Sequence, residues 1–232
     1  MIKKINPYDT VKRMLKGDIE QLIWGGILFV PESGPSVDYY DYVSFKELRD
    51  DDQNLELLIG TGVVWNDPDL KFRVKFMWKD HANGGVCVGH PGQNVTSSSS
   101  WDYYKSNRFF TYQGRPNFDL DGDPEHQGHR ISGSNMVNDQ EYDLTFGNNY
   151  IYDNINETYI TQSSRIDFEP VQDVEILFDM AHWWIKSLEI RDGQDNILFD
   201  GVAAGKDGVF GLYDSIGRSL HYTDQEAEGH NL

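Results

Sequence analysis

The chain has 232 residues, with 38 Asp and Glu against 20 Lys and Arg, which gives a formal net charge of −18 at pH 7. This charge argues strongly against DNA or RNA as a partner, because their phosphates require a basic face, and it disfavours anionic lipid. The single cysteine, Cys87, excludes an internal disulfide. Aromatic residues make up 13% of the chain and glycines number 22, which favours β-structure with many turns.

The N-terminal part has a pattern of its own. Three short apolar segments (VKRML, DIEQLIW and ILFVP) are separated by glycine turns within residues 11–31, which predicts a small β-meander. We interpret 1–31 as a docking or oligomerisation arm, with an extra strand pair packed on the main sheet as the alternative. Residues 32–38 (ESGPSVD) have the composition of a linker, so the main domain covers 39–232.

Short strands of alternating polarity fill much of the main domain. The clearest is 70–79, where apolar residues alternate with Lys71, Arg73, Lys75 and Lys79, so one face is buried and the other is wet. The inward residues of this strand are Leu70, Phe72, Val74, Phe76 and Trp78. Many such strands at regular spacing predict an all-β sandwich or jelly roll of two antiparallel sheets.

Three local features refine this prediction. The Gly-Thr-Gly of 60–62 predicts a turn, and Asn148-Asn149 predicts a tight hairpin, because Asn tolerates positive φ. A turn or two of helix over 43–49 is the only helical segment that we expect.

The region 94–138 is polar, glycine-rich and interspersed with aromatic residues, and loops of this length tend to be functional. Aromatic rings stack on the apolar faces of sugars while polar groups bond the hydroxyls. Adjacent strand residues point to opposite faces, so one of Tyr103 and Tyr104 should be buried, as should one of Trp183 and Trp184. The candidate glycan-binding residues are Trp101, Tyr103, Tyr104, Tyr112 and Asn135.

The acidic run 119–125 (DLDGDPE) is the candidate metal site. Alternating carboxylates on a turn can surround calcium, the one cofactor that the sequence suggests. The run departs from the EF-hand template at Pro124 and Arg130, so a solvated acidic turn is the alternative. His126 and His129 add a transition metal as a further alternative. The candidate calcium ligands are Asp119, Asp121 and Asp123.

The C-terminal segment carries a resemblance to a known family. An alternating strand ends at Arg191, and a polar turn, a second strand, a loop, the tetrapeptide GLYD at 211–214 and an aromatic strand ending at Tyr222 follow. This order resembles the closing segment of laminin-G-like jelly rolls in the concanavalin A-like lectin superfamily, where GLYD forms a turn. The resemblance is best over 142–222 and extends to 41–89. It implies a concanavalin A-like jelly roll.

The resemblance implies a binding module rather than an enzyme. The superfamily includes family 16 glucanases, whose catalytic strand carries E-x-D-x-E. The nearest string here is RIDFE, with Arg165 in place of the first Glu before Asp167 and Glu169. Retaining glycosidases need a nucleophile and an acid/base carboxylate, so this replacement predicts no catalysis. A degenerate glycoside hydrolase is the alternative.

Many bacterial and phage surface proteins carry this type of domain, and similar strand–glycine–strand starts occur at the N-termini of phage virion proteins. We therefore predict a homo-oligomeric virion surface protein, of tail or fibre type, that binds a host surface glycan or a neighbouring virion protein. A purely structural capsid decoration or fibre-base protein is the alternative. The sequence has no evident signal peptide, which fits a virion location, with the cell surface as the alternative. No membrane insertion is expected, because the longest apolar run, 22–30, is about half the ~20 residues required.

Overall fold

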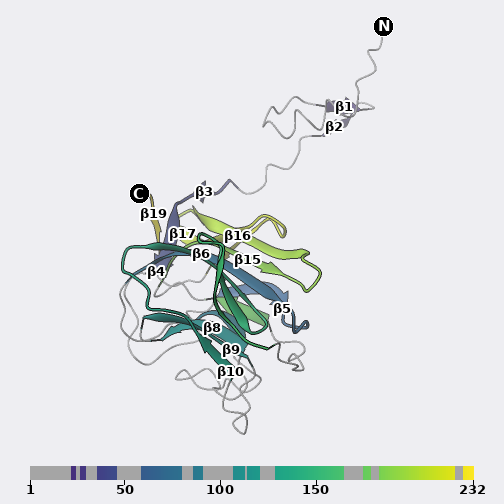
Figure 1. Ribbon diagram of the computed structural model, residues 1–232. Helices are drawn as coiled ribbons and strands as arrows, with labels where there is room; N and C mark the ends of the chain where they lie inside the picture. The colour runs from purple at the N-terminus through teal and green to yellow at the C-terminus, as the bar shows by residue number, and fades with distance from the viewer. Residues whose placement is uncertain are drawn as a thin grey trace, which may run out of the picture. The chain divides into compact units, whose positions relative to one another are not determined.

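In the computed structural model the chain forms two compact units, Met1–Ser36 and Val37–Leu232. The residues that the structure describes are 22–24, 27–29, 36–45, 59–79, 86–90, 107–112, 114–120, 129–164, 175–178, 183–222 and 227–232. In the first unit, β1 (Leu22–Trp24) and β2 (Ile27–Phe29) pair antiparallel (Figure 1). These strands fall within two of the three predicted apolar segments, and the third, VKRML, lies outside the described residues.

The second unit is built from two antiparallel sheets (Figure 1). In the small sheet the strand order is β10-β9-β8-β7-β14-β5, and in the large sheet it is β13-β12-β11-β6-β15-β16-β17-β18. Off this path, β3 pairs with β16, β4 pairs with β15, and β19 pairs with β4. All described elements of the chain are strands. No helix in the described ranges is long and apolar enough to cross a membrane.

The strands of the small sheet are β5 (Ile59–Val64), β7 (Val86–His90), β8 (Asn107–Tyr112), β9 (Arg115–Leu120), β10 (His129–Ser132) and β14 (Glu175–Phe178). Those of the large sheet are β3 (Asp38–Tyr39), β4 (Tyr42–Phe45), β6 (Lys71–Trp78), β11 (Glu141–Gly147), β12 (Tyr150–Asp153), β13 (Thr158–Gln162), β15 (Trp183–Arg191), β16 (Ile197–Lys206), β17 (Val209–Asp214), β18 (Ser219–Tyr222) and β19 (Ala227–His230).

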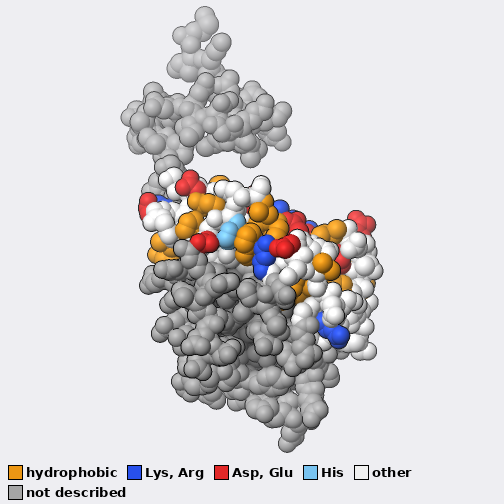
Figure 2. Space-filling view, turned by 90° about the vertical axis from the view of Figure 1, so that its left-hand side faces the viewer, with side chains coloured by type: hydrophobic (Ala, Val, Ile, Leu, Met, Phe, Trp, Pro, Cys, Tyr) orange, Lys and Arg blue, Asp and Glu red, His pale blue; other side chains and the backbone are white. Residues whose placement is uncertain are grey.

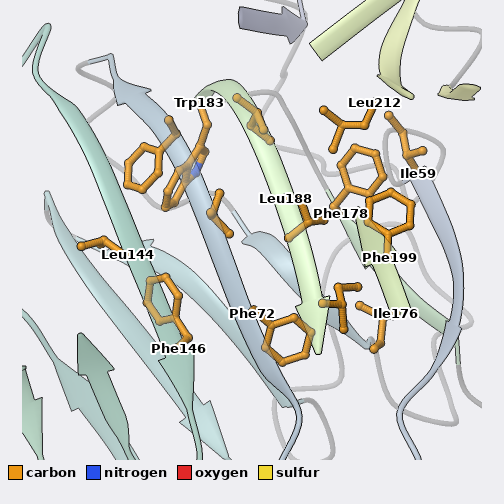
Figure 3. Packing of buried hydrophobic residues seen from close by; sticks show 14 of the residues in the cluster. Ile59, Phe72, Leu144, Phe146, Ile176, Phe178, Trp183, Leu188, Phe199 and Leu212 are labelled. Atoms are coloured by element: carbon orange, nitrogen blue, oxygen red, sulfur yellow. The ribbon is translucent and has the colours of Figure 1, made fainter. Parts of the chain in front are cut away.

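One hydrophobic core joins the two sheets (Figure 3). Phe178 of the small sheet meets Phe199 of the large sheet with ring centroids 6.4 Å apart, and Phe76 packs on Trp183 at 3.8 Å. The predicted alternation of β6 is confirmed, since Phe72 is 1% exposed and Phe76 is fully buried. Burying each such side chain contributes roughly 1.5–3 kcal/mol, so the sandwich depends on this inward face.

Two predicted local structures are wrong. Residues 60–62 do not form a turn but lie inside β5, opposite a register shift in β14. Gly60 leaves room for the Glu175 carboxylate, which accepts a hydrogen bond from the Gly62 amide at 2.6 Å. The glycines therefore accommodate an irregular strand pairing. Val43 to Phe45, expected in a helical turn, belong to β4, because Val43 pairs with Ile185 and is fully buried.

The C-terminal segment also differs in detail from its prediction. GLYD is not a turn, because Gly211 to Asp214 form the end of β17, and the turn comes at 215–218. The Asp214 carboxylate holds this turn by accepting hydrogen bonds from the amides of Ile216 at 3.0 Å and Gly217 at 2.7 Å. The Asn148-Asn149 hairpin is confirmed, with Asn149 at φ 67° between β11 and β12.

Candidate functional site

The structure describes only part of the predicted glycan site. Trp101, Tyr103 and Tyr104 lie outside the described residues. Tyr112 is the last residue of β8 and pairs with Arg115 of β9, but its side chain is not among those that the structure describes. Asn135 is exposed, and its Oδ1 accepts a hydrogen bond from Arg115 Nε at 2.6 Å. Arg115 thus adjoins two of the five predicted residues, and the site as a whole stays a prediction.

The predicted calcium site is described at one residue. Asp119 lies on β9 in register with Arg108 of β8 and Arg130 of β10, while Asp121 and Asp123 fall outside the described ranges. Within those ranges, no group of three His, Cys, Asp or Glu side chains is placed to hold a metal ion. Calcium binding by the acidic run stays a prediction.

A different surface gathers functional side chains: the outward face of the large sheet. Cross-strand pairing places six residues side by side there, because paired residues share a face. We call these residues the cross-strand row. They are Tyr159 of β13, Tyr152 of β12, Thr145 of β11, Arg73 of β6, Glu189 of β15 and Asp200 of β16. Residues next to the row, such as Leu144, Ile151 and Leu188, are buried in the core, and Ile160 of β13 packs against it, so the row lies on the opposite, outward face.

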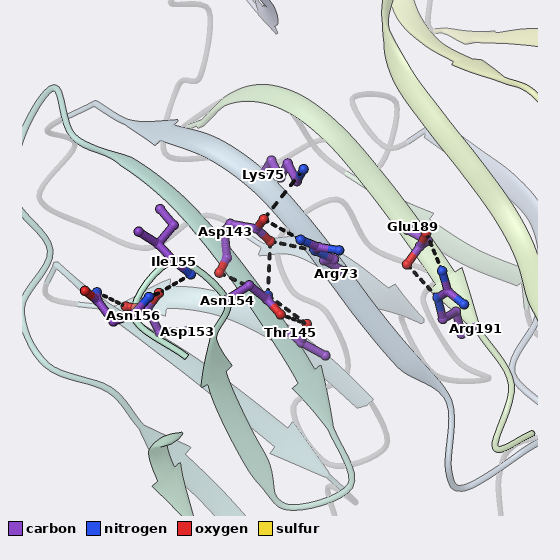
Figure 4. A network of polar contacts seen from close by, with 10 residues as sticks. All are labelled: Arg73, Lys75, Asp143, Thr145, Asp153, Asn154, Ile155, Asn156, Glu189 and Arg191. Atoms are coloured by element: carbon purple, nitrogen blue, oxygen red, sulfur yellow. Dashed lines mark hydrogen bonds and ion pairs between the residues drawn. The ribbon is translucent and has the colours of Figure 1, made fainter. Parts of the chain in front are cut away.

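Asp143, beside the row on β11, fixes its centre (Figure 4). Arg73 donates to it from Nε at 2.8 Å and from Nη2 at 2.7 Å, and Asn154 donates at 3.0 Å. The Arg73 side chain is 40% exposed and that of Asp143 only 11%, so the guanidinium group lies above the carboxylate. The hydrogen bond from Arg73 to Asp143 raises the pKa of Arg73, which therefore presents a fixed positive group.

Neighbouring polar groups are fixed in the same way. Arg191 donates from Nε and Nη2 to the two carboxylate oxygens of Glu189, at 2.7 and 2.9 Å (Figure 4). Ser215 donates to the Asp200 carboxylate at 2.7 Å. Bidentate pairing of guanidinium and carboxylate groups defines orientation as well as distance. The central part of the row is therefore a rigid array of donors and acceptors.

Aromatic rings occupy one end of the row. Tyr159 is 51% exposed and makes edge contacts with Tyr152 at 5.0 Å and Tyr150 at 5.7 Å between ring centroids. Burial raises the pKa of Tyr150 to about 12, so this phenol stays protonated at physiological pH. The surface combines one exposed ring and two half-buried rings with fixed polar groups, which is the composition of a site for a polar organic ligand.

Of the paired tryptophans, one is buried and one faces outward, as predicted. Trp183 is 1% exposed, whereas Trp184 lies on the outward face near the C-terminal strand. His230 stacks on the Trp184 indole at 3.7 Å and 7°, and Lys79 Nζ lies 3.9 Å from the ring centroid. Figure 2, viewed from the side of β4 and β19, shows a histidine among hydrophobic, basic and acidic side chains. Trp184 thus anchors β19 and is not an open platform for a sugar.

A second polar cluster lies between Trp184 and the row. Tyr42 donates a hydrogen bond to Glu141, and Lys186 Nζ binds the same carboxylate at 3.0 Å. Burial alone would raise the pKa of Glu141, but the bonds from Tyr42 and Lys186 outweigh it and lower that pKa. Glu141 is therefore held ionised, which is unfavourable for a general acid.

Comparisons with known proteins agree with the fold. By sequence, the chain matches no family model and no curated protein. By structure, it is similar to a Bacteroides ovatus protein proposed to bind carbohydrate, with a TM-score of 0.53 and 10% identity over 84% of this chain. The match spans 61% of that protein. At this identity the likeness concerns the fold alone, and it confirms the predicted fold class, an all-β jelly-roll sandwich of two antiparallel sheets.

Two further structures show weaker similarity. Sheep galectin-11 gives a TM-score of 0.38 and 17% identity, over 57% of this chain and 95% of its own. A pentraxin from Limulus polyphemus gives 0.44 and 11%, over 70% of this chain and 80% of its own. TM-scores this low define no common site.

The His230 environment predicts a pH-dependent stability. Burial lowers the pKa of His230 and Lys79 adds to this effect, against the opposing influence of Glu228. As the pH falls below about 6.5, the unfolded chain takes up a proton that the folded chain resists, so the free energy of unfolding decreases. Urea denaturation at pH 7 and pH 5 should show this loss in the wild type and a smaller loss in His230→Phe.

Ser44→Ala is the matched control. It removes the hydrogen-bond partner of His230 Nε2, 2.7 Å away, but keeps the titrating ring. This variant should be less stable at both pH values and should keep the pH dependence of the wild type. Equal pH dependence in the wild type and His230→Phe would contradict the assignment.

Proposed function

We propose that this chain is a non-enzymatic carbohydrate-binding protein and that it binds a glycan on the outward face of the large sheet. The observation that carries the proposal is the cross-strand row, in which the exposed ring of Tyr159 and the half-buried ring of Tyr152 continue into fixed donors and acceptors. Sugars offer apolar ring faces and closely spaced hydroxyl groups, and the row offers partners for both. Sites built on strands also hold their side chains more accurately than sites on loops.

The hydrogen-bond pattern supports a binding role over catalysis. Both carboxylate oxygens of Asp143 and of Glu189 accept hydrogen bonds from arginine, so neither is open to attack a sugar or to protonate a leaving group. Glycoside hydrolysis needs two such free carboxylates, one of them with a raised pKa. The string with Asp167 and Glu169 lies outside the described residues, and a hydrolase built on it is the alternative to this proposal.

A glycan array tests the proposal with two matched variants. Arg73→Lys keeps the positive charge but loses the planar fork that Asp143 orients, and we expect it to weaken glycan binding about tenfold, or ~1.4 kcal/mol. Arg115→Lys makes the same change on the small sheet, beside Asn135, and should bind like the wild type. Circular dichroism of both variants controls for folding.

Two other results of the glycan array would change the proposed site or the proposed function. Binding lost in Arg115→Lys and kept in Arg73→Lys would move the site to the region 94–138. Absence of binding to every glycan of the array would refute carbohydrate binding.

We further propose, from the sequence resemblance, that the protein is a phage virion surface component with 1–31 as its assembly arm. The division into Met1–Ser36 and Val37–Leu232 supports an arm that can be removed without disturbing the sandwich. Deletion of residues 1–31 should convert a homo-oligomer into a monomer, as measured by light scattering coupled to size-exclusion chromatography. A monomer in both forms would contradict the role of the arm and would favour a free-standing lectin-like domain.

A further inference from the structure

The cross-strand row also indicates what kind of glycan it fits. We infer that the row binds an internal stretch of an extended polysaccharide, which lies across the strands, and not a single terminal sugar. This inference rests on the proposed function and adds the length and direction of the ligand.

The cross-strand row is longer than a single sugar. It crosses six consecutive strands, β13-β12-β11-β6-β15-β16, at one level of the sheet. Neighbouring strands lie about 4.8 Å apart, so its five intervals span about 24 Å. A single sugar would contact only a small part of this length, whereas a chain of several sugars would contact all of it.

The side chains of the outward face change from aromatic to hydrogen-bonding in the direction across the strands. Across the strands, the surface passes from the exposed ring of Tyr159 and the half-buried ring of Tyr152 to the mixed donors and acceptors around Arg73 and Glu189. Along β6 itself, a ligand would meet lysine and arginine side chains in succession, with the ammonium group of Lys75 3.6 Å from Asp143. The direction across the strands therefore joins the ring of Tyr159 to the hydrogen-bonding groups around Arg73.

The two end residues of the row are both partly exposed to solvent. Tyr159 is half exposed at one end, and Asp200, bonded to the exposed Ser215, lies at the other. Asp200 itself is half-buried, so both end residues keep part of their surface accessible to the continuation of a chain. A site for a terminal sugar would instead need groups that enclose its end.

The inference predicts that affinity depends on ligand length. The probes are homologous series of glucose, galactose, mannose and N-acetylglucosamine oligomers, from the monosaccharide upward, measured by calorimetry against the intact protein. For the series that binds, the Kd should decrease with each added unit until the oligomer spans the row, and then stay constant.

Variants at the ends of the row sharpen the test. Tyr159→Ala and Asp200→Asn should each weaken the longest oligomer several-fold and leave the shortest binding oligomer unchanged. Tyr39→Ala is the control, because Tyr39 is 62% exposed on the same sheet but pairs with Ala204, about 13 Å along β16 from Asp200. It should bind every oligomer like the wild type.

The outcomes separate this inference from the function on which it rests. No binding to any oligomer or polysaccharide overturns the proposed function itself. A monosaccharide that binds as tightly as the longest oligomer, or end variants that weaken short and long ligands equally, would leave carbohydrate binding intact and overturn the extended site.

Discussion

The antiparallel pairing of β6 with both β11 and β15 is the constraint on which the outward face depends. Every second residue of β6 is fixed in the core by large apolar side chains such as Phe72 and Phe76, so the residues between them must face solvent. A slip of one residue would exchange the two faces, at the cost of the core. The burial of the inner face therefore determines the position of Arg73 relative to Glu189 on the outer face.

The same pairing explains how a strongly acidic chain presents arginine and lysine on this face without a large local charge. Arg73, Arg191 and Lys186 each bind a carboxylate from Asp143, Glu189 and Glu141, respectively. Exposed ion pairs of this kind contribute little to stability, since solvent screens them. Their effect here is orientation, because each carboxylate holds its cation in one geometry. Groups that are oriented but nearly neutral as a set suit the uncharged hydroxyls of a glycan.

The sequence predicted the scaffold more fully than the site. The alternation of residues 70–79 was sufficient to identify the buried and wet faces, and the positive φ of Asn149 agrees with the expected hairpin. The partners of Arg73 could not be found in this way, because Asp143 lies 70 positions away and only the register of β11 on β6 brings the two together. The aromatic content of 94–138 predicted a site in loops. Tyr152 and Tyr159 are distant from Arg73 in the sequence, and only strand pairing places them in the same cross-strand row.

The location of the ligand on the protein is the most direct test of this account. Amide chemical shifts of the ¹⁵N-labelled protein would be followed by NMR during titration with the glycan selected on the array. The account predicts that the largest changes fall on β6, β11 and β15, with smaller changes on β12, β13 and β16. Changes confined to β8, β9 and the segment around Asn135, with β6 unaffected, would contradict it.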